Sequence, residues 1–171
     1  MKAVVDTNVP VVANGGSEQA SPECVQACAV CLHELTRAGR LVLDDQRLIL
    51  NEYRANLRSS GQPGLGDAFL KWVLTNYSNP DRCEFVAITS TGGTPSSFAE
   101  FPQSAALAGF DPDDRKFVAV ATAHGDHPPV VQAVDTEWWR LKDALEEAGV
   151  NVNFLCPNDM RAILRRQEST E

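Results

Sequence analysis

The chain has 171 residues and a formal net charge of −8, and 43% of its residues are hydrophobic while 22% are charged. These values fit one globular domain with a real core, and the acidic balance argues against a generic binder of duplex DNA. No apolar run approaches the roughly 18 residues of a membrane span, so no membrane contact is expected. The first residues enter a strand with no signal-peptide pattern, which favours a cytoplasmic location.

Residues 3–5 form a short apolar run that ends in Asp6. An unbroken apolar run is typical of a strand buried on both faces, as in the middle of a parallel sheet. Ligands bind at the carboxyl ends of such strands, so Asp6 is a candidate site residue. The alternative is that Asp6 only caps the following helix, a position that Asp favours.

A helix is predicted over about residues 21–38. It carries Cys24, Cys28 and Cys31 at spacings of four and three, which place the thiols on one face. They are either a thiolate metal site or small hydrophobic residues of the core, and we favour the core because no Cys-x-x-Cys pair occurs elsewhere. With five cysteines and no signal sequence, a disulfide framework is not expected.

Residues 41–43 predict a second buried strand, followed by a helix to about residue 58 that Asp44 or Asp45 caps. Glu52 lies on or beside the apolar stripe of this helix, where a carboxylate is out of place in a plain core. It either contributes to a site or forms a salt bridge with a nearby arginine. The nearby arginines, which share one helical edge and are either RNA contacts or a solvated polar face, are Arg47, Arg54 and Arg58.

The middle of the chain predicts a loop over 61–66, a helix over about 67–77 and a strand over 85–88. A Ser- and Gly-rich loop over 90–97 provides either substrate contacts or slack. A helix with an acid-rich start follows over 115–123. Asp114 is expected on its sheet-facing side, because apolar residues follow it at the spacings of one helical face.

Residues 130–134 predict another buried strand, which also ends in an acid, Asp135. The turn before it contains His124 and His127, which we interpret as a surface turn rather than a zinc site because only one other histidine exists in the chain. A helix over 136–148, a strand over 151–155 and a helix to about residue 166 complete the chain. Two strands that deliver carboxylates to one edge suggest a divalent cation, since like charges about 4 Å apart cost on the order of 4 kcal/mol at an effective dielectric near 20.

Strands therefore alternate with helices along the whole chain, which predicts an α/β fold: a single-domain three-layer α/β/α sandwich with a central parallel sheet. The domain is expected to span residues 1–165, with a polar tail over 166–171. Four acids stand out against this frame, namely Asp6, Glu52, Asp114 and Asp135. Two of them end strands, one lies on an apolar helix face and one begins a helix.

The order and surroundings of these acids resemble the PIN-domain family of metal-dependent ribonucleases. The residues that carry the resemblance are Val4-Val5-Asp6-Thr7-Asn8, Asn51-Glu52-Tyr53, Asp114 with the apolar run 117–121, and Val134-Asp135. Each motif is weak alone, while the ordered set is more specific, and together they span the chain from Met1 to about Leu164.

The resemblance implies that Asp6, Glu52, Asp114 and Asp135 hold one or two Mg²⁺ or Mn²⁺ ions, which activate a water to hydrolyse RNA. It also implies that Thr7 and Asn8 orient a ligand or water. Small family members are often toxins of bacterial toxin–antitoxin pairs (VapC-like) and form dimers. An antitoxin protein and a homodimer are therefore further implications of the resemblance.

The sequence departs from the family at several positions. Many members have Thr or Ser two residues before the last acid, where this chain has Ala133. Glu137, two residues after that acid, is either a supplementary acid or an ordinary helix-start acid. The segment over 76–109 is longer than in compact members, which bears on substrate and subfamily more than on fold.

Two other functions are compatible with parts of the sequence. A catalytically inert PIN-like module that binds a protein partner would suit the acidic net charge and the lack of a basic stripe. A phosphatase of the haloacid-dehalogenase type also begins with a strand and an Asp, but it needs a second Asp where this chain has Asn8.

Overall fold

The computed structural model describes residues 1–94 and 96–169, which form one sheet covered by helices. All strand pairs are parallel, and the strand order is β3-β2-β1-β4-β5. The strands are β1 (Lys2–Val5), β2 (Arg40–Asp44), β3 (Cys83–Val86), β4 (Val130–Gln132) and β5 (Val152–Phe154). The predicted single-domain α/β sandwich with a central parallel sheet is confirmed.

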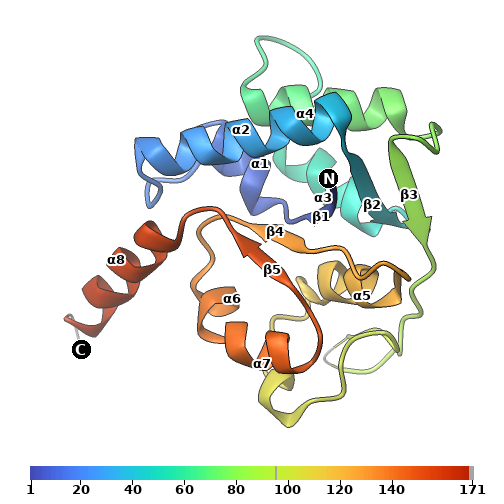
Figure 1. The fold of residues 1–171 in the computed structure, drawn as a ribbon, viewed down its shortest axis with the longest axis vertical. Coiled ribbons are helices and arrows are strands. Elements are labelled where there is room, and N and C mark those ends of the chain that lie inside the picture. Colours follow the sequence, from blue (N-terminus) through green and yellow to red (C-terminus); the bar gives the residue numbers. More distant parts are fainter. Residues whose placement is uncertain (95, 170–171) are drawn as a thin grey trace.

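Helices cover both faces of this sheet (Figure 1). On one side lie α1 (Asn8–Ala13), α2 (Pro22–Ala38) and α4 (Leu65–Asn76), and on the other lie α5 (Arg115–Ala123), α6 (Thr136–Arg140) and α7 (Lys142–Glu147). The remaining helices are α3 (Leu48–Asn56), which contacts β2 and α5, the 3₁₀ turn η1 (Ala105–Leu107), and α8 (Pro157–Glu168), which contacts α6. No helix among the described residues is long and apolar enough to cross a membrane.

The order of the strands creates a switch point beside β1. The chain first builds the sheet outward from β1 through β2 to β3, and then returns to place β4 on the other side of β1. The facing residues Val4, Val5, Val130 and Val131 are fully buried, because helices cover both faces. In open α/β sheets, ligands bind outside the carboxyl ends of the strands at such a point.

Several predicted elements differ in extent from the observed ones. The strand predicted over 130–134 ends at Gln132, because the backbone N–H of Val134 donates to Oδ1 of Asn8 instead of continuing the ladder. The helix predicted over 136–148 is divided at Leu141, whose φ of −96° and ψ of 7° leave the helical region. The strand predicted over 85–88 begins earlier, at Cys83.

Helices α1 and α4 approach each other closely at Gly66. A Cβ atom on this residue would lie 1.8 Å from the carbonyl oxygen of Pro10, so only glycine fits. Oδ1 of Asn14 accepts hydrogen bonds from the N–H groups of Gly66 and Asp67. This side chain satisfies the first amides of α4, which explains why the helix begins at Leu65 rather than at the predicted Asp67.

A disulfide joins Cys24 near the start of α2 to Cys156, the residue before α8, although the cysteine count and the lack of a signal sequence argued against a disulfide framework. Next to it, the carboxylate of Asp159 accepts hydrogen bonds from the N–H and hydroxyl of Ser21. The two cysteines are 132 residues apart in sequence, so their pairing depends on the fold. Helix α8 continues to Glu168, into the segment assigned to a tail, whose residues 170–171 lie outside the described residues.

Candidate functional site

Asp6 lies directly after β1, at the carboxyl edge of the sheet and next to the switch point. Its side chain is only 5% exposed. Oδ1 accepts a hydrogen bond from the backbone N–H of Asn8 at 2.7 Å, so Asp6 does assist the start of α1. Within the described residues no other hydrogen bond reaches this carboxylate.

Asp44 shows what a purely structural acid looks like at the same edge. It ends β2 and is completely buried, yet its oxygens accept hydrogen bonds from the backbone N–H groups of Gln46, Leu48 and Ile49 at 2.8–3.0 Å. Asp44 therefore caps α3, and of the two capping residues that the sequence predicted, Asp44 and Asp45, it is the one that does so. Capping of this kind does not account for Asp6, which has a single such bond.

Asp114 immediately precedes α5, and one of its carboxylate oxygens lies near Trp138 of α6. The indole Nε1–H donates to Oδ2 of Asp114 at 3.1 Å. Burial raises the pKa of Asp114 to about 7, because the lowering effect of this hydrogen bond is smaller than the cost of removing the charge from water. The negative charge of Asp135 contributes to this raised value.

Asp135 is the residue before α6, and its Oδ1 accepts hydrogen bonds from the N–H groups of Glu137 at 2.8 Å and Trp138 at 3.5 Å. It is therefore both a helix cap and a member of the acidic group. Oε1 of Glu137 accepts a hydrogen bond at 2.7 Å from the backbone N–H of Asp111, in the segment that leads to Asp114. Glu137 thus helps to hold the segment before Asp114 in position.

Glu52 projects from α3 and pairs with the ammonium group of Lys116 on α5. Lys116 also donates to the carbonyl oxygen of Asp113, and its side chain is 11% exposed. The sequence suggested Arg47, Arg54 or Arg58 as the partner in a salt bridge with Glu52, and that expectation is wrong. The cation that Glu52 meets comes from the helix that follows Asp114.

These four acids lie close enough to influence one another electrostatically. Burial raises the pKa of Asp6 well above its usual value, and the charges of Asp114, Glu52 and Asp135 raise it further, while the Asn8 N–H lowers it. The fold thus brings together the four predicted acids from the end of β1, the middle of α3 and the starts of α5 and α6. Mutual repulsion of this kind is relieved by protonation or by a bound cation.

The donor set fits a hard divalent cation. Four carboxylates supply the oxygen ligands that Mg²⁺ and Mn²⁺ prefer. Beside Asp6, the hydroxyl of Thr7 is buried and has no hydrogen-bond partner among residues 1–94 and 96–169. In that same part of the chain, no three of the carboxylates have oxygens within 4.8 Å of one another. The carboxylates are therefore not arranged as a closed set of metal ligands, and the binding of Mg²⁺ or Mn²⁺ here stays a prediction.

The two polar residues predicted beside Asp6 have different roles. The backbone N–H of Asn8 donates a hydrogen bond to Asp6, and its side-chain Oδ1 accepts one from the backbone N–H of Val134. Asn8 therefore connects the segment after β1 to the segment after β4. The hydroxyl of Thr7 is buried and has no hydrogen-bond partner in the described part of the chain. Both lie where they could orient a ligand, which stays a prediction.

The three arginines predicted on one helical edge do not share it. Arg47 precedes α3 with a φ of 66°, and its guanidinium lies 5.7 Å from the centre of the Tyr77 ring. Arg54 lies within α3, but the helix ends at Asn56, so Arg58 is beyond it. All three are exposed, and their contact with RNA is untested.

Sequence reasoning missed three buried residues on the elements that carry or precede the candidate acids. Lys116 was not singled out, although a lysine between Asp114 and an unbroken apolar run was a usable signal of burial. Trp138 is completely buried, and nothing in the sequence pattern indicates its bond to Asp114. Gln132 is completely buried in β4, and its Nε2 has no partner within the described part of the chain.

Comparisons of the chain with protein-family models, with curated proteins and with solved structures found no significant match.

Proposed function

We propose that this protein is a metal-dependent endoribonuclease of the PIN type, with Asp6, Glu52, Asp114 and Asp135 as its metal-binding carboxylates. The observation that carries the proposal is the convergence of these four acids, from four separate segments, at the switch point of a parallel sheet. Capping explains Asp44 and part of Asp135, but it leaves the buried carboxyls of Asp6 and Asp114 with raised pKa values. A bound cation would offset the free-energy cost of burying these carboxyl groups in their charged form.

A divalent ion in this cluster would lower the pKa of an attacking water and offset negative charge on the phosphate. The protein's own residues supply the rest. The Trp138 indole fixes one oxygen of Asp114, and the backbone amides at the start of α6 fix Asp135, so both carboxylates are held before a substrate binds. Asn8 orients Asp6 in the same way.

The substrate and partners follow from the resemblance rather than from a contact in the molecule. RNA is the proposed substrate, and Mg²⁺ or Mn²⁺ is the proposed cofactor. The proposed partners are an antitoxin protein and a second copy of the chain in a homodimer. The net charge of −8 makes a local contact surface more important than overall attraction to the phosphate backbone.

A second candidate is an inert PIN-like module that binds a protein. The pairing of Lys116 with Glu52 favours it, because a resident ammonium group already offsets one of the four charges. The two functions differ in metal affinity. An active site of the proposed kind gains thermal stability from Mn²⁺, whereas an inert module does not.

The test is cleavage of a labelled single-stranded RNA in the presence of Mn²⁺, Mg²⁺ or EDTA. Asp6→Asn should abolish cleavage while the circular dichroism spectrum stays native. The matched control is Asp113→Asn, which makes the same charge change at an exposed acid beside Asp114 and should stay active. Full activity of Asp6→Asn would exclude the proposed centre, and absence of both cleavage and a Mn²⁺-dependent melting shift would favour the inert module.

A further inference from the structure

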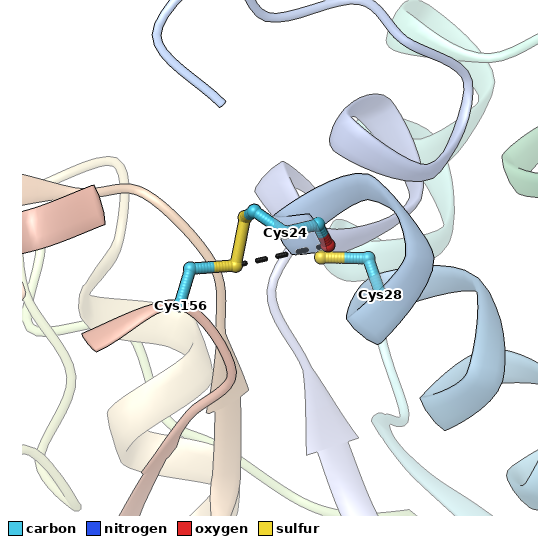
Figure 2. A group of neighbouring side chains, drawn as sticks. All are labelled: Cys24, Cys28 and Cys156. Atoms are coloured by element: carbon cyan, nitrogen blue, oxygen red, sulfur yellow. Dashed lines mark hydrogen bonds between the residues drawn. A yellow bond between two sulfur atoms is a disulfide. The ribbon is translucent and has the colours of Figure 1, made fainter. Parts of the chain in front are cut away.

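Three cysteines gather where α2 meets the start of α8 (Figure 2). Cys24 lies in the first turn of α2, Cys28 lies one turn later, and Cys156 immediately precedes α8. Their sulfur atoms all lie within 4.8 Å of one another, and all three residues are buried. Cys24 and Cys156 form the disulfide, and Cys28 is a free thiol beside it.

The surroundings of Cys28 argue against a role as an attacking thiol. Burial is the main cause that raises its pKa to about 12, and the charges of Cys31 and Asp159 contribute to this value. A thiol in this state is protonated at neutral pH and exchanges slowly with a disulfide. Disulfide exchange therefore does not explain why the thiol of Cys28 lies next to the disulfide.

The positions of the three cysteines would suit a thiolate metal site once the disulfide is reduced. A zinc ion bound at about 2.3 Å to each sulfur in tetrahedral geometry separates the sulfurs by about 3.8 Å. The Cα atoms of Cys24 and Cys156 are 5.2 Å apart, and their side chains already converge with that of Cys28. Two of the three residues lie at helix N-termini, where the positive end of the helix dipole favours thiolates.

We propose that the reduced protein binds one Zn²⁺ ion through Cys24, Cys28 and Cys156, and that the disulfide is the oxidised, metal-free form of this site. A dithiol reductant supplies two electrons and two protons, which break the S–S bond into two thiols as the reductant becomes a disulfide. Zinc then replaces the three thiol protons, which are released to water, and forms three Zn–S bonds. Asp159 is not counted as a fourth ligand, because both of its oxygens accept hydrogen bonds from Ser21.

Both the disulfide and the proposed zinc ion would connect the start of α8 to α2, but only the zinc ion would bind Cys28. This difference makes Cys28 the residue to test. Cys31 provides a matched control, since it is a buried free cysteine on the same helix, with a pKa that burial raises to about 11, and it is outside the cluster.

The experiment is a titration of the full chain, reduced and kept free of oxygen, with Co²⁺ as the spectroscopic probe and Zn²⁺ as its competitor. The wild-type protein should develop sulfur-to-cobalt charge-transfer absorption and intense visible bands at one equivalent, and Zn²⁺ should abolish them. Cys28→Ser should weaken Zn²⁺ binding by more than about 100-fold, since even indirect partners of a metal ligand contribute about 10–100-fold. Cys31→Ser should bind as the wild type does.

Circular dichroism accompanies each titration, and Cys28→Ala replaces Cys28→Ser if the serine variant does not fold. Absence of the cobalt bands in reduced, folded wild-type protein would overturn the proposal. Equal affinity in Cys28→Ser and wild type would overturn it too. The disulfide-bonded protein should show no charge-transfer band, and a band of equal strength there would contradict the assignment of Cys24 and Cys156 as ligands.

Discussion

Replacement of Asp114 by asparagine should stabilise the metal-free protein at alkaline pH. The folded state holds the pKa of this carboxyl at about 7, against an ordinary value of 3.8. Between these pH values the folded protein binds more protons than the unfolded chain, so the stability of the wild-type protein falls as the pH rises from about 4 to about 7. The asparagine side chain of the variant carries no charge, and its amide oxygen can still accept the bond from Trp138.

The raised pKa sets the size of the effect. A folded-state pKa near 7 corresponds to about 4 kcal/mol of lost stability above that pH, and this is a ceiling. Water reaches part of the Asp114 side chain, so we expect Asp114→Asn to gain about 2 kcal/mol at pH 8. The gain should vanish near pH 4, where the wild-type carboxyl is protonated in both states.

The assay is urea unfolding in EDTA at several pH values from 4 to 8, followed by circular dichroism. Asp113→Asn provides the control for the change in net charge, since Asp113 is exposed and adjacent. Added Mn²⁺ should raise the stability of the wild-type protein more than that of Asp114→Asn, because the variant lacks one proposed ligand. If Asp114→Asn is no more stable than Asp113→Asn at pH 8, the repulsion inferred for this cluster is refuted.

Two further predictions concern the surroundings of the site, and a third concerns the packing of α1 against α4. Lys116→Met should destabilise the metal-free protein by about 1–3 kcal/mol while strengthening Mn²⁺ binding, because Glu52 loses its ammonium partner and becomes free for a metal; calorimetric titration that finds weaker Mn²⁺ binding would contradict this. Trp138→Phe should lower stability more at pH 8 than at pH 5 in urea unfolding, since the lost indole bond stabilises a charged carboxylate; an equal loss at both pH values would argue against that bond. Gly66→Ala should cost about 1–3 kcal/mol in thermal unfolding, because its Cβ would meet the Pro10 carbonyl at 1.8 Å, and an unchanged melting temperature would show that the two helices can separate.

Local patterns in the sequence determined the fold class and the four acids of the candidate site. The apolar runs before Asp6 and Asp135 predict strands buried on both faces, and the acids that end them must then lie at one edge of the sheet. The interruption of an apolar helix face predicts the direction of Glu52 in the same way. These inferences succeed because they depend only on residues that are neighbours along the chain.

The roles of these acids depend on contacts that local patterns do not encode. Asp6 and Asp44 both end a central strand, and only the backbone that follows separates a capping acid from a site acid. After Asp44 the chain turns through Arg47, at a φ of 66°, so that several amides face the carboxylate. No sequence rule distinguishes this turn from the one after Asp6.

Tertiary structure alone decided the pairings between distant segments. Lys116 meets Glu52 because α5 packs beside α3, whereas sequence spacing suggested an arginine on the same helix. Cys24 meets Cys156 because the last strand returns the chain to the start of α2, which brings together cysteines 132 residues apart. The position of each strand in the sheet fixes these encounters, and that position is set by burial summed over the whole core rather than by any single segment.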